Sequence, residues 1–152
     1  MKSFQSIQEV LDYAIGQEQA AYEFYLGLAK NARDIGLAGA LEEFAQEELG
    51  HKAKLEAVKR GEYLLETRAG PAPGLGLAEH LVEGELTPEM GYPEALILAM
   101  KKEKASYRLY MDLAALADDA ATQSLFVALA GEEAKHKLRF EIEYDDYVLK
   151  ES

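Results

Sequence analysis

The stretch AQEELGHK at residues 45–52 recurs almost unchanged as AGEEAKHK at residues 130–137. Both copies carry the spacing Glu-x-x-His, and residues three apart on an α-helix project from one face. Both copies also lie in runs where apolar residues recur every three or four positions, as they do on an amphipathic helix. The repeated motif therefore predicts two helices that each turn one glutamate and one histidine toward the interior.

A second repeated stretch precedes each motif. EQAAYEFY at residues 18–25 matches EKASYRLY at residues 103–110, with the same offset of 85 residues that separates Glu18 from Glu103. No insertion is needed between the matched segments, so the chain reads as two copies of one helical hairpin. The repeat predicts an all-α bundle of four helices.

Capping signals and breaks in the apolar pattern set the expected helix boundaries. Ser6 followed by Glu9 is a capping box, and Gly61 is a typical helix end. The intervening segment 61–92 is rich in Pro and Gly and predicts one long crossover, with a short helix near residues 77–82. We expect a single domain over residues 1–152, as two antiparallel hairpins with helices at about 6–32, 37–60, 93–117 and 119–149.

Polar residues on the apolar stripes are the candidate functional residues. They are Glu18, Glu48, His51, Glu103, Glu133 and His136. Burying a carboxylate without a partner costs several kcal/mol, and the nearby lysines fall off the stripes. Two divalent ions would balance four carboxylates, and two neutral imidazoles would complete the ligand set. A metal-free network of interhelical hydrogen bonds remains the alternative.

Composition restricts the partners of the chain. The formal net charge of −12 disfavours nucleic acid and anionic membrane surfaces. The absence of cysteine excludes disulfides, thiolate zinc sites and iron–sulfur clusters on this chain. No window reaches the ~20 apolar residues of a membrane span, and the N-terminus lacks the apolar run of a signal peptide. We therefore expect a cytoplasmic protein that binds neither nucleic acid nor membrane.

At these motifs the sequence resembles the rubrerythrin branch of the ferritin-like di-iron carboxylate superfamily. The resemblance covers all four expected helices and implies a ferritin-like bundle that holds two iron ions, with manganese as the other metal to consider. It implies that Glu18 and Glu103 are terminal ligands, that Glu48 and Glu133 bridge the metals, and that His51 and His136 each cap one ion. The four glutamates would then form the catalytic centre.

The same resemblance implies a function. Such proteins reduce hydrogen peroxide or oxidise ferrous iron with dioxygen or peroxide, and they are expected to form homodimers. Rubrerythrins carry a rubredoxin domain that this chain lacks, so an external electron donor is expected. They also carry an additional ligating glutamate one turn along the third helix, where this chain has Ser106 after Glu103 and Met100 before it. Our first hypothesis is a di-iron peroxidase; the alternatives are a ferroxidase or iron-handling protein, a manganese catalase-like site and a structural metal module.

Three further sets of residues yield weaker expectations. Four tyrosines near the first ligands are expected to be core residues or hydrogen-bond donors to the ligands; they are Tyr22, Tyr25, Tyr107 and Tyr110. Glu47 and Glu132 lie about 100° around the helix from the ligands, which predicts solvent-facing salt bridges. Gly50 and Gly131 would permit a close approach of helices near the metals.

Overall fold

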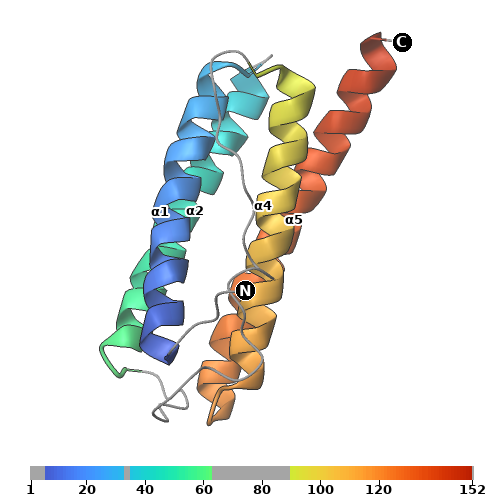
Figure 1. Ribbon diagram of the computed structural model, residues 1–152. Helices are drawn as coiled ribbons and strands as arrows, with labels where there is room; N and C mark the ends of the chain where they lie inside the picture. Colours follow the sequence, from blue (N-terminus) through green and yellow to red (C-terminus); the bar gives the residue numbers. More distant parts are fainter. Residues whose placement is uncertain (1–5, 33–34, 63–89, 152) are drawn as a thin grey trace.

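The computed structural model describes residues 6–32, 35–62 and 90–151. These residues form four helices, α1 (Ile7–Lys30), α2 (Ile35–Lys59), α4 (Tyr92–Ala115) and α5 (Ala120–Glu151). Helices α1 and α2 run antiparallel, as do α4 and α5, and the two hairpins lie side by side (Figure 1). The predicted all-α bundle of two hairpins is confirmed, and each helix end lies within two residues of its expected position.

Local hydrogen bonds explain where the helices begin and end. The hydroxyl of Ser6 accepts the backbone N–H of Glu9 at 3.2 Å, and Asp119 Oδ1 accepts that of Thr122 at 2.8 Å. Each side chain thus satisfies an amide that has no partner within its own helix. After α2, Gly61 takes a φ of +88°, a left-handed conformation that glycine adopts without steric cost. The crossover and the short helix expected near residues 77–82 lie outside the described residues.

The interior consists of two apolar clusters, one toward each end of the bundle. Within each hairpin the two helices pack along their length, whereas the backbones of different hairpins approach closely at few points in the described chain. The first cluster is built around Leu11, Leu55, Leu113, Phe126 and Leu129. The second is built around Tyr25, Leu28, Leu41, Leu96 and Phe140. The polar residues of the repeated motifs lie in the chain between the members of the two clusters.

The repeated glycines do not bring helices together. Gly50 and Gly131 are both exposed, and a Cβ atom built on either would meet nothing within 4 Å. The expectation of a close helix approach at these glycines is therefore wrong.

The lengths and compositions of the helices also bear on membranes. No helix in the part of the chain that the structure describes is long and apolar enough to cross a bilayer.

Candidate metal centre

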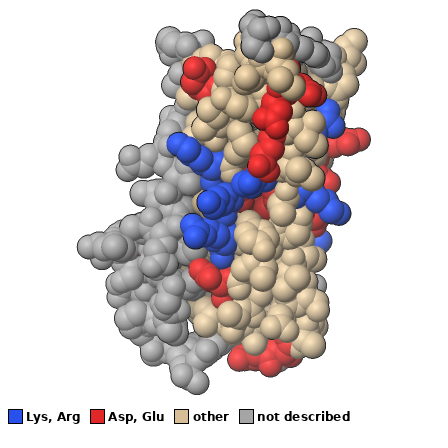
Figure 2. Space-filling view, turned by 90° about the vertical axis from the view of Figure 1, so that its right-hand side faces the viewer, with Lys and Arg blue, Asp and Glu red and all other residues tan. Residues whose placement is uncertain are grey.

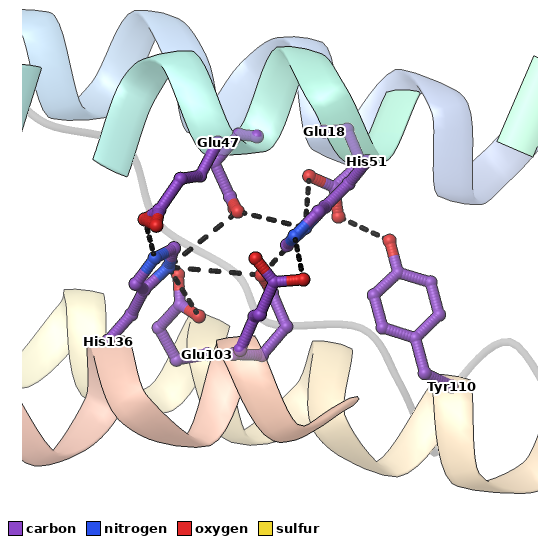
Figure 3. Close-up of polar contacts among 9 residues, drawn as sticks. Glu18, Glu47, His51, Glu103, Tyr110 and His136 are labelled. Atoms are coloured by element: carbon purple, nitrogen blue, oxygen red, sulfur yellow. Dashed lines mark hydrogen bonds and ion pairs between the residues drawn. The ribbon is translucent and has the colours of Figure 1, made fainter. Parts of the chain in front are cut away.

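All four helices contribute to one buried polar layer. The structure brings together Glu18 from α1, Glu48 and His51 from α2, Glu103 from α4, and Glu133 and His136 from α5 (Figure 3). Each of the six is at most 2% exposed. The helical register of the two repeats therefore places all six predicted ligands in one layer.

The ring nitrogen Nδ1 of His51 faces three carboxylates. It lies 3.1 Å from Glu133 Oε1, 3.2 Å from Glu48 Oε1 and 3.5 Å from Glu18 Oε2. These four residues form one group whose ligand atoms all lie within 4.8 Å of one another. The group has the size and the donor types of a single metal site.

His136 occupies the equivalent place in the second repeat. Its Nδ1 lies 3.6 Å from both Glu48 Oε1 and Glu103 Oε2, and 3.8 Å from Glu133 Oε1. These residues form a second group, which shares Glu48 and Glu133 with the first. Two overlapping groups with two common carboxylates have the arrangement that a pair of bridged metal ions requires.

Many of the carboxylate and imidazole atoms of this layer lack a hydrogen-bond partner. Buried atoms without a partner include one or both carboxylate oxygens of each glutamate and the Nδ1 atoms of both histidines. The buried part of the described chain contains no Lys or Arg that could neutralise the carboxylates. An unpartnered buried charge is strongly destabilising, so this donor set fits two divalent cations and fits a metal-free hydrogen-bond network poorly.

Without metal, the layer must take up protons. Burial, with repulsion from Glu133, raises the pKa of Glu18 to about 7. The same two causes raise the pKa of Glu48 and Glu103 well above the ordinary value. Burial alone would lower the pKa of His51, but its contacts with Glu133, Glu18 and Glu48 raise it. Burial alone would raise the pKa of Glu133, but its contacts with His51 and Glu48 and the charge of His136 lower it. Protons therefore take the place of the cations in the metal-free protein.

The two repeated tyrosines of the core differ in their contacts. Tyr110 is fully buried and donates its hydroxyl hydrogen to Glu18 Oε1 across the bundle. Burial and the charge of Glu18 raise the pKa of Tyr110 well above its usual value, so it stays a donor. Tyr25 is buried too, but its ring packs edge-on against His136, with centroids 6.1 Å apart. Tyr22 is half-buried and Tyr107 is 38% exposed.

Glu47 and Glu132 do not form the solvent-facing salt bridges expected of them. Glu47 Oε2 lies 2.7 Å from Nε2 of His136 in a hydrogen bond, and Glu132 Oε2 lies 3.4 Å from Nε2 of His51. Glu47 thus reaches the outer nitrogen of a histidine in the other hairpin (Figure 3). Glu132 makes the equivalent, longer contact with His51. For His136, the carboxylate of Glu47 can accept the hydrogen of Nε2, which would leave Nδ1 free of hydrogen to bind a metal. The only sign of this contact in the sequence is that both motifs carry two consecutive glutamates.

The two histidine rings also have different neighbours. His136 stacks on Phe44, with ring centroids 4.1 Å apart and planes 27° apart. The repeat places Leu129 at the position equivalent to Phe44, since the offset between the halves is the same 85 residues. The second histidine is therefore held more firmly, by an aromatic stack together with the shorter carboxylate contact.

A pocket of about 430 Å³ reaches the buried layer from the side of α1 and α4. Its wall includes Glu103 of the ligand layer, together with Gln17, Lys102 and Ser106. Structural metal sites are typically closed by protein ligands, whereas catalytic sites keep an open position. Glu103, one of the six residues of the buried layer, thus borders this pocket.

The fold of this chain is similar to those of two proteins of known structure. A hypothetical protein from Pyrococcus furiosus is 26% identical with a TM-score of 0.71, over 92% of this chain and 89% of the other. A manganese catalase from Anabaena is 20% identical with a TM-score of 0.69, over 92% of this chain and 71% of the other. A second structure of that catalase has a TM-score of 0.64 at the same identity and coverage. The shared fold is the ferritin-like helical bundle.

Sequence comparison identifies the family. None of the curated protein sequences matches this chain. The family model described as Rubrerythrin matches residues 9–144, which include all four helices and all six residues of the buried layer. Its match, together with the two groups of carboxylate and histidine ligands, supports a dinuclear metal protein of the ferritin-like class. The chain belongs to the rubrerythrin family.

Proposed function

We propose that this protein is a dinuclear metal oxidoreductase that reduces hydrogen peroxide with electrons from an external donor. The observation that carries the proposal is the pair of overlapping ligand groups that share Glu48 and Glu133. Membership of the rubrerythrin family supports the peroxide chemistry. We propose iron as the metal, with the six buried residues as its ligands.

The six candidate ligands would hold the two metal ions in different ways. Glu48 and Glu133 are the candidates to bridge, because each belongs to both groups, whereas Glu18 and Glu103 each belong to one. A diferrous pair would supply the two electrons that, with two protons, convert one hydrogen peroxide into two water molecules. The external donor would then restore those electrons.

The surrounding residues support this chemistry in three ways. Tyr110 holds Glu18 in place through its hydroxyl. The two apolar clusters keep bulk water from the ends of the layer, so charges within it interact more strongly than they would in water. The pocket beside Glu103 would admit a molecule as small as peroxide. A purely structural metal module would not need such access.

The test begins with metal analysis of the purified protein. The reduced protein is then mixed, without air, with hydrogen peroxide or with dioxygen, and reoxidation is followed by absorption. We expect two irons per chain, one peroxide consumed per pair, and faster reoxidation by peroxide than by dioxygen. Glu133→Ala should lose the metal and the reaction, whereas the exposed substitution Glu141→Ala should keep both. If the reduced di-iron protein is not reoxidised by hydrogen peroxide, the proposal is wrong.

A second candidate is a manganese site that disproportionates peroxide without a donor. It is favoured by the fold shared with the Anabaena manganese catalase and by a ligand set of oxygen and nitrogen atoms alone, which suits manganese as well as iron. Manganese-loaded protein that releases dioxygen from peroxide with no reductant present would favour this function. A ferroxidase would instead oxidise many Fe²⁺ ions per chain, with iron as its substrate.

A further inference from the structure

The pocket between α1 and α4 is larger than hydrogen peroxide needs. Its volume is about 430 Å³. A water molecule takes about 30 Å³ in the liquid, so hydrogen peroxide, with two oxygen atoms, would need roughly 60 Å³. Pockets that bind small organic ligands measure about 300–1,000 Å³. The pocket therefore has the size of a site for an organic molecule.

The wall of the pocket combines apolar and polar side chains. Its apolar residues all come from α1, and they are Ala20, Ala21, Phe24 and Tyr25. On α4, Ser106 lines the pocket at the position equivalent to Ala21, since the two are 85 residues apart. Small side chains at these equivalent positions leave room between the two helices. An apolar wall with a few polar groups is typical of a site that binds and orients an organic ligand.

The exposed charges of the wall balance one another. Glu23 is exposed and Lys102 is half-buried, and the remaining charged residue of the wall is the buried Glu103. Figure 2 shows more Lys and Arg gathered at mid-height on the side of the molecule that lies to the right in Figure 1. Of the described basic residues, however, only Lys102 lines the pocket. The wall therefore suits an uncharged organic molecule better than a charged one.

Glu103 links the pocket to the buried layer. It is the one candidate ligand of the six that lines the pocket, and its Oε2 atom is buried without a hydrogen-bond partner. The same carboxylate belongs to the second ligand group, with His136. A molecule in the pocket thus lies beside the proposed metal pair. We propose that the pocket holds the organic part of an alkyl or aryl hydroperoxide, with its O–O group directed toward Glu103.

This inference rests on the proposed peroxidase function and gives it a second class of substrate. Two electrons, supplied by the reduced metal pair and restored by the external donor, break the O–O bond of the hydroperoxide. With two protons, the products are one alcohol, which keeps the oxygen bound to carbon, and one water molecule. The apolar wall favours such a substrate, because burying the alkyl or aryl group removes apolar surface from water.

The substrate class is tested with the reduced, metal-loaded full chain, mixed without air with hydrogen peroxide or with cumene hydroperoxide. We expect both to reoxidise the protein, and we expect one cumyl alcohol per metal pair from the second. If neither peroxide reacts, the proposed function fails and this inference fails with it. If hydrogen peroxide alone reacts, the proposed function stands and this inference is overturned.

The pocket is tested by narrowing it. Ala21→Leu should lower kcat/KM for cumene hydroperoxide about 10-fold relative to that for hydrogen peroxide, the order of discrimination that a methylene group produces in an apolar pocket. Ala20→Leu, at an exposed position of the wall, is a second variant in case the first does not fold. The matched control is Ala53→Leu, at an exposed alanine of α2 outside the pocket wall, which should leave the ratio unchanged.

Binding of the product gives a readout that needs no turnover. Cumyl alcohol should bind the oxidised, metal-loaded protein in calorimetry, and the pocket variants should bind it more weakly than the control does. A ratio of kcat/KM values, or an alcohol affinity, that both pocket variants leave unchanged would overturn the assignment of the pocket to the organic group.

Discussion

The two hairpins of this protein carry the same kinds of buried polar residues, but their exposed residues differ. Inside, each hairpin supplies one glutamate from its first helix and Glu-x-x-His from its second, and all six side chains are buried together. Outside, α5 carries a stripe of large apolar residues where α2 carries small and polar ones. Both hairpins contribute side chains to the same two groups of candidate ligands, so a substitution in either hairpin would affect the whole layer. The outer faces are not subject to that constraint, so their residues can differ between the two hairpins.

The largest expected effect comes from the two shared carboxylates. Glu48→Ala and Glu133→Ala should each abolish the binding of both metal ions, because each glutamate belongs to both groups. Metal at about 1,000 times its Kd stabilises a folded protein by about 4 kcal/mol, and that stabilisation should disappear. Metal analysis and urea unfolding measure the two effects. A variant that keeps one ion would separate the halves of the site and contradict the bridging roles.

The metal-free protein should lose stability as pH rises. Glu18 has a pKa raised from 4.5 to about 7 in the folded state, and burial also raises the pKa values of Glu48 and Glu103 well above their ordinary value. Between about pH 4.5 and pH 7 the folded state therefore binds more protons than the unfolded state, so the free energy of unfolding falls across this range. Glu133, whose pKa is lowered, opposes this trend only at the acidic end.

Urea unfolding of chelator-treated protein at pH 5 and pH 8 measures this dependence. Added metal should reverse the trend, because metal binding needs deprotonated carboxylates and strengthens with pH. Glu18→Gln should flatten the metal-free curve in part. Equal stability of the chelated wild-type protein at both pH values would show that the layer does not take up protons on folding.

The two core tyrosines test the asymmetry between the halves. Tyr110→Phe removes the buried hydrogen bond to Glu18 and should cost about 1.5–3 kcal/mol, the range for a hydrogen bond to a charged group. Tyr25→Phe keeps the ring packing on His136 and should cost less. Thermal unfolding of the metal-loaded variants provides the comparison. Equal losses would mean that the two tyrosines are equivalent after all.

The smallest effect is expected at the residues that orient the histidines. Glu47→Gln should weaken metal binding about 10- to 100-fold, because an amide holds the Nε2 hydrogen of His136 less strongly than a carboxylate does. Glu132→Gln should have a smaller effect, since its contact with His51 is longer. Competition with a coloured chelator measures both affinities. A larger loss of metal affinity in Glu132→Gln than in Glu47→Gln would contradict the expectation that His136 is held more firmly than His51.

Most of the fold was predictable because its signals are local or repeated. Apolar spacing and capping residues gave the helix ends, and the 85-residue repeat gave the six buried residues. Glu47 and Glu132 were misplaced because helical spacing gives the direction of a side chain but not its reach across a neighbouring helix. The difference between Tyr25 and Tyr110 also escaped prediction, since it depends on neighbours such as Phe44 that come from another helix.

The separation of the ligands between two hairpins also bears on when the protein can acquire its metal. The connections within the hairpins are short, so each hairpin can form before the long crossover brings the two together. During synthesis the first hairpin emerges with Glu18, Glu48 and His51, but without Glu133 to share an ion. With the proposed ligands, stable binding of two metal ions would therefore require both hairpins to be packed together.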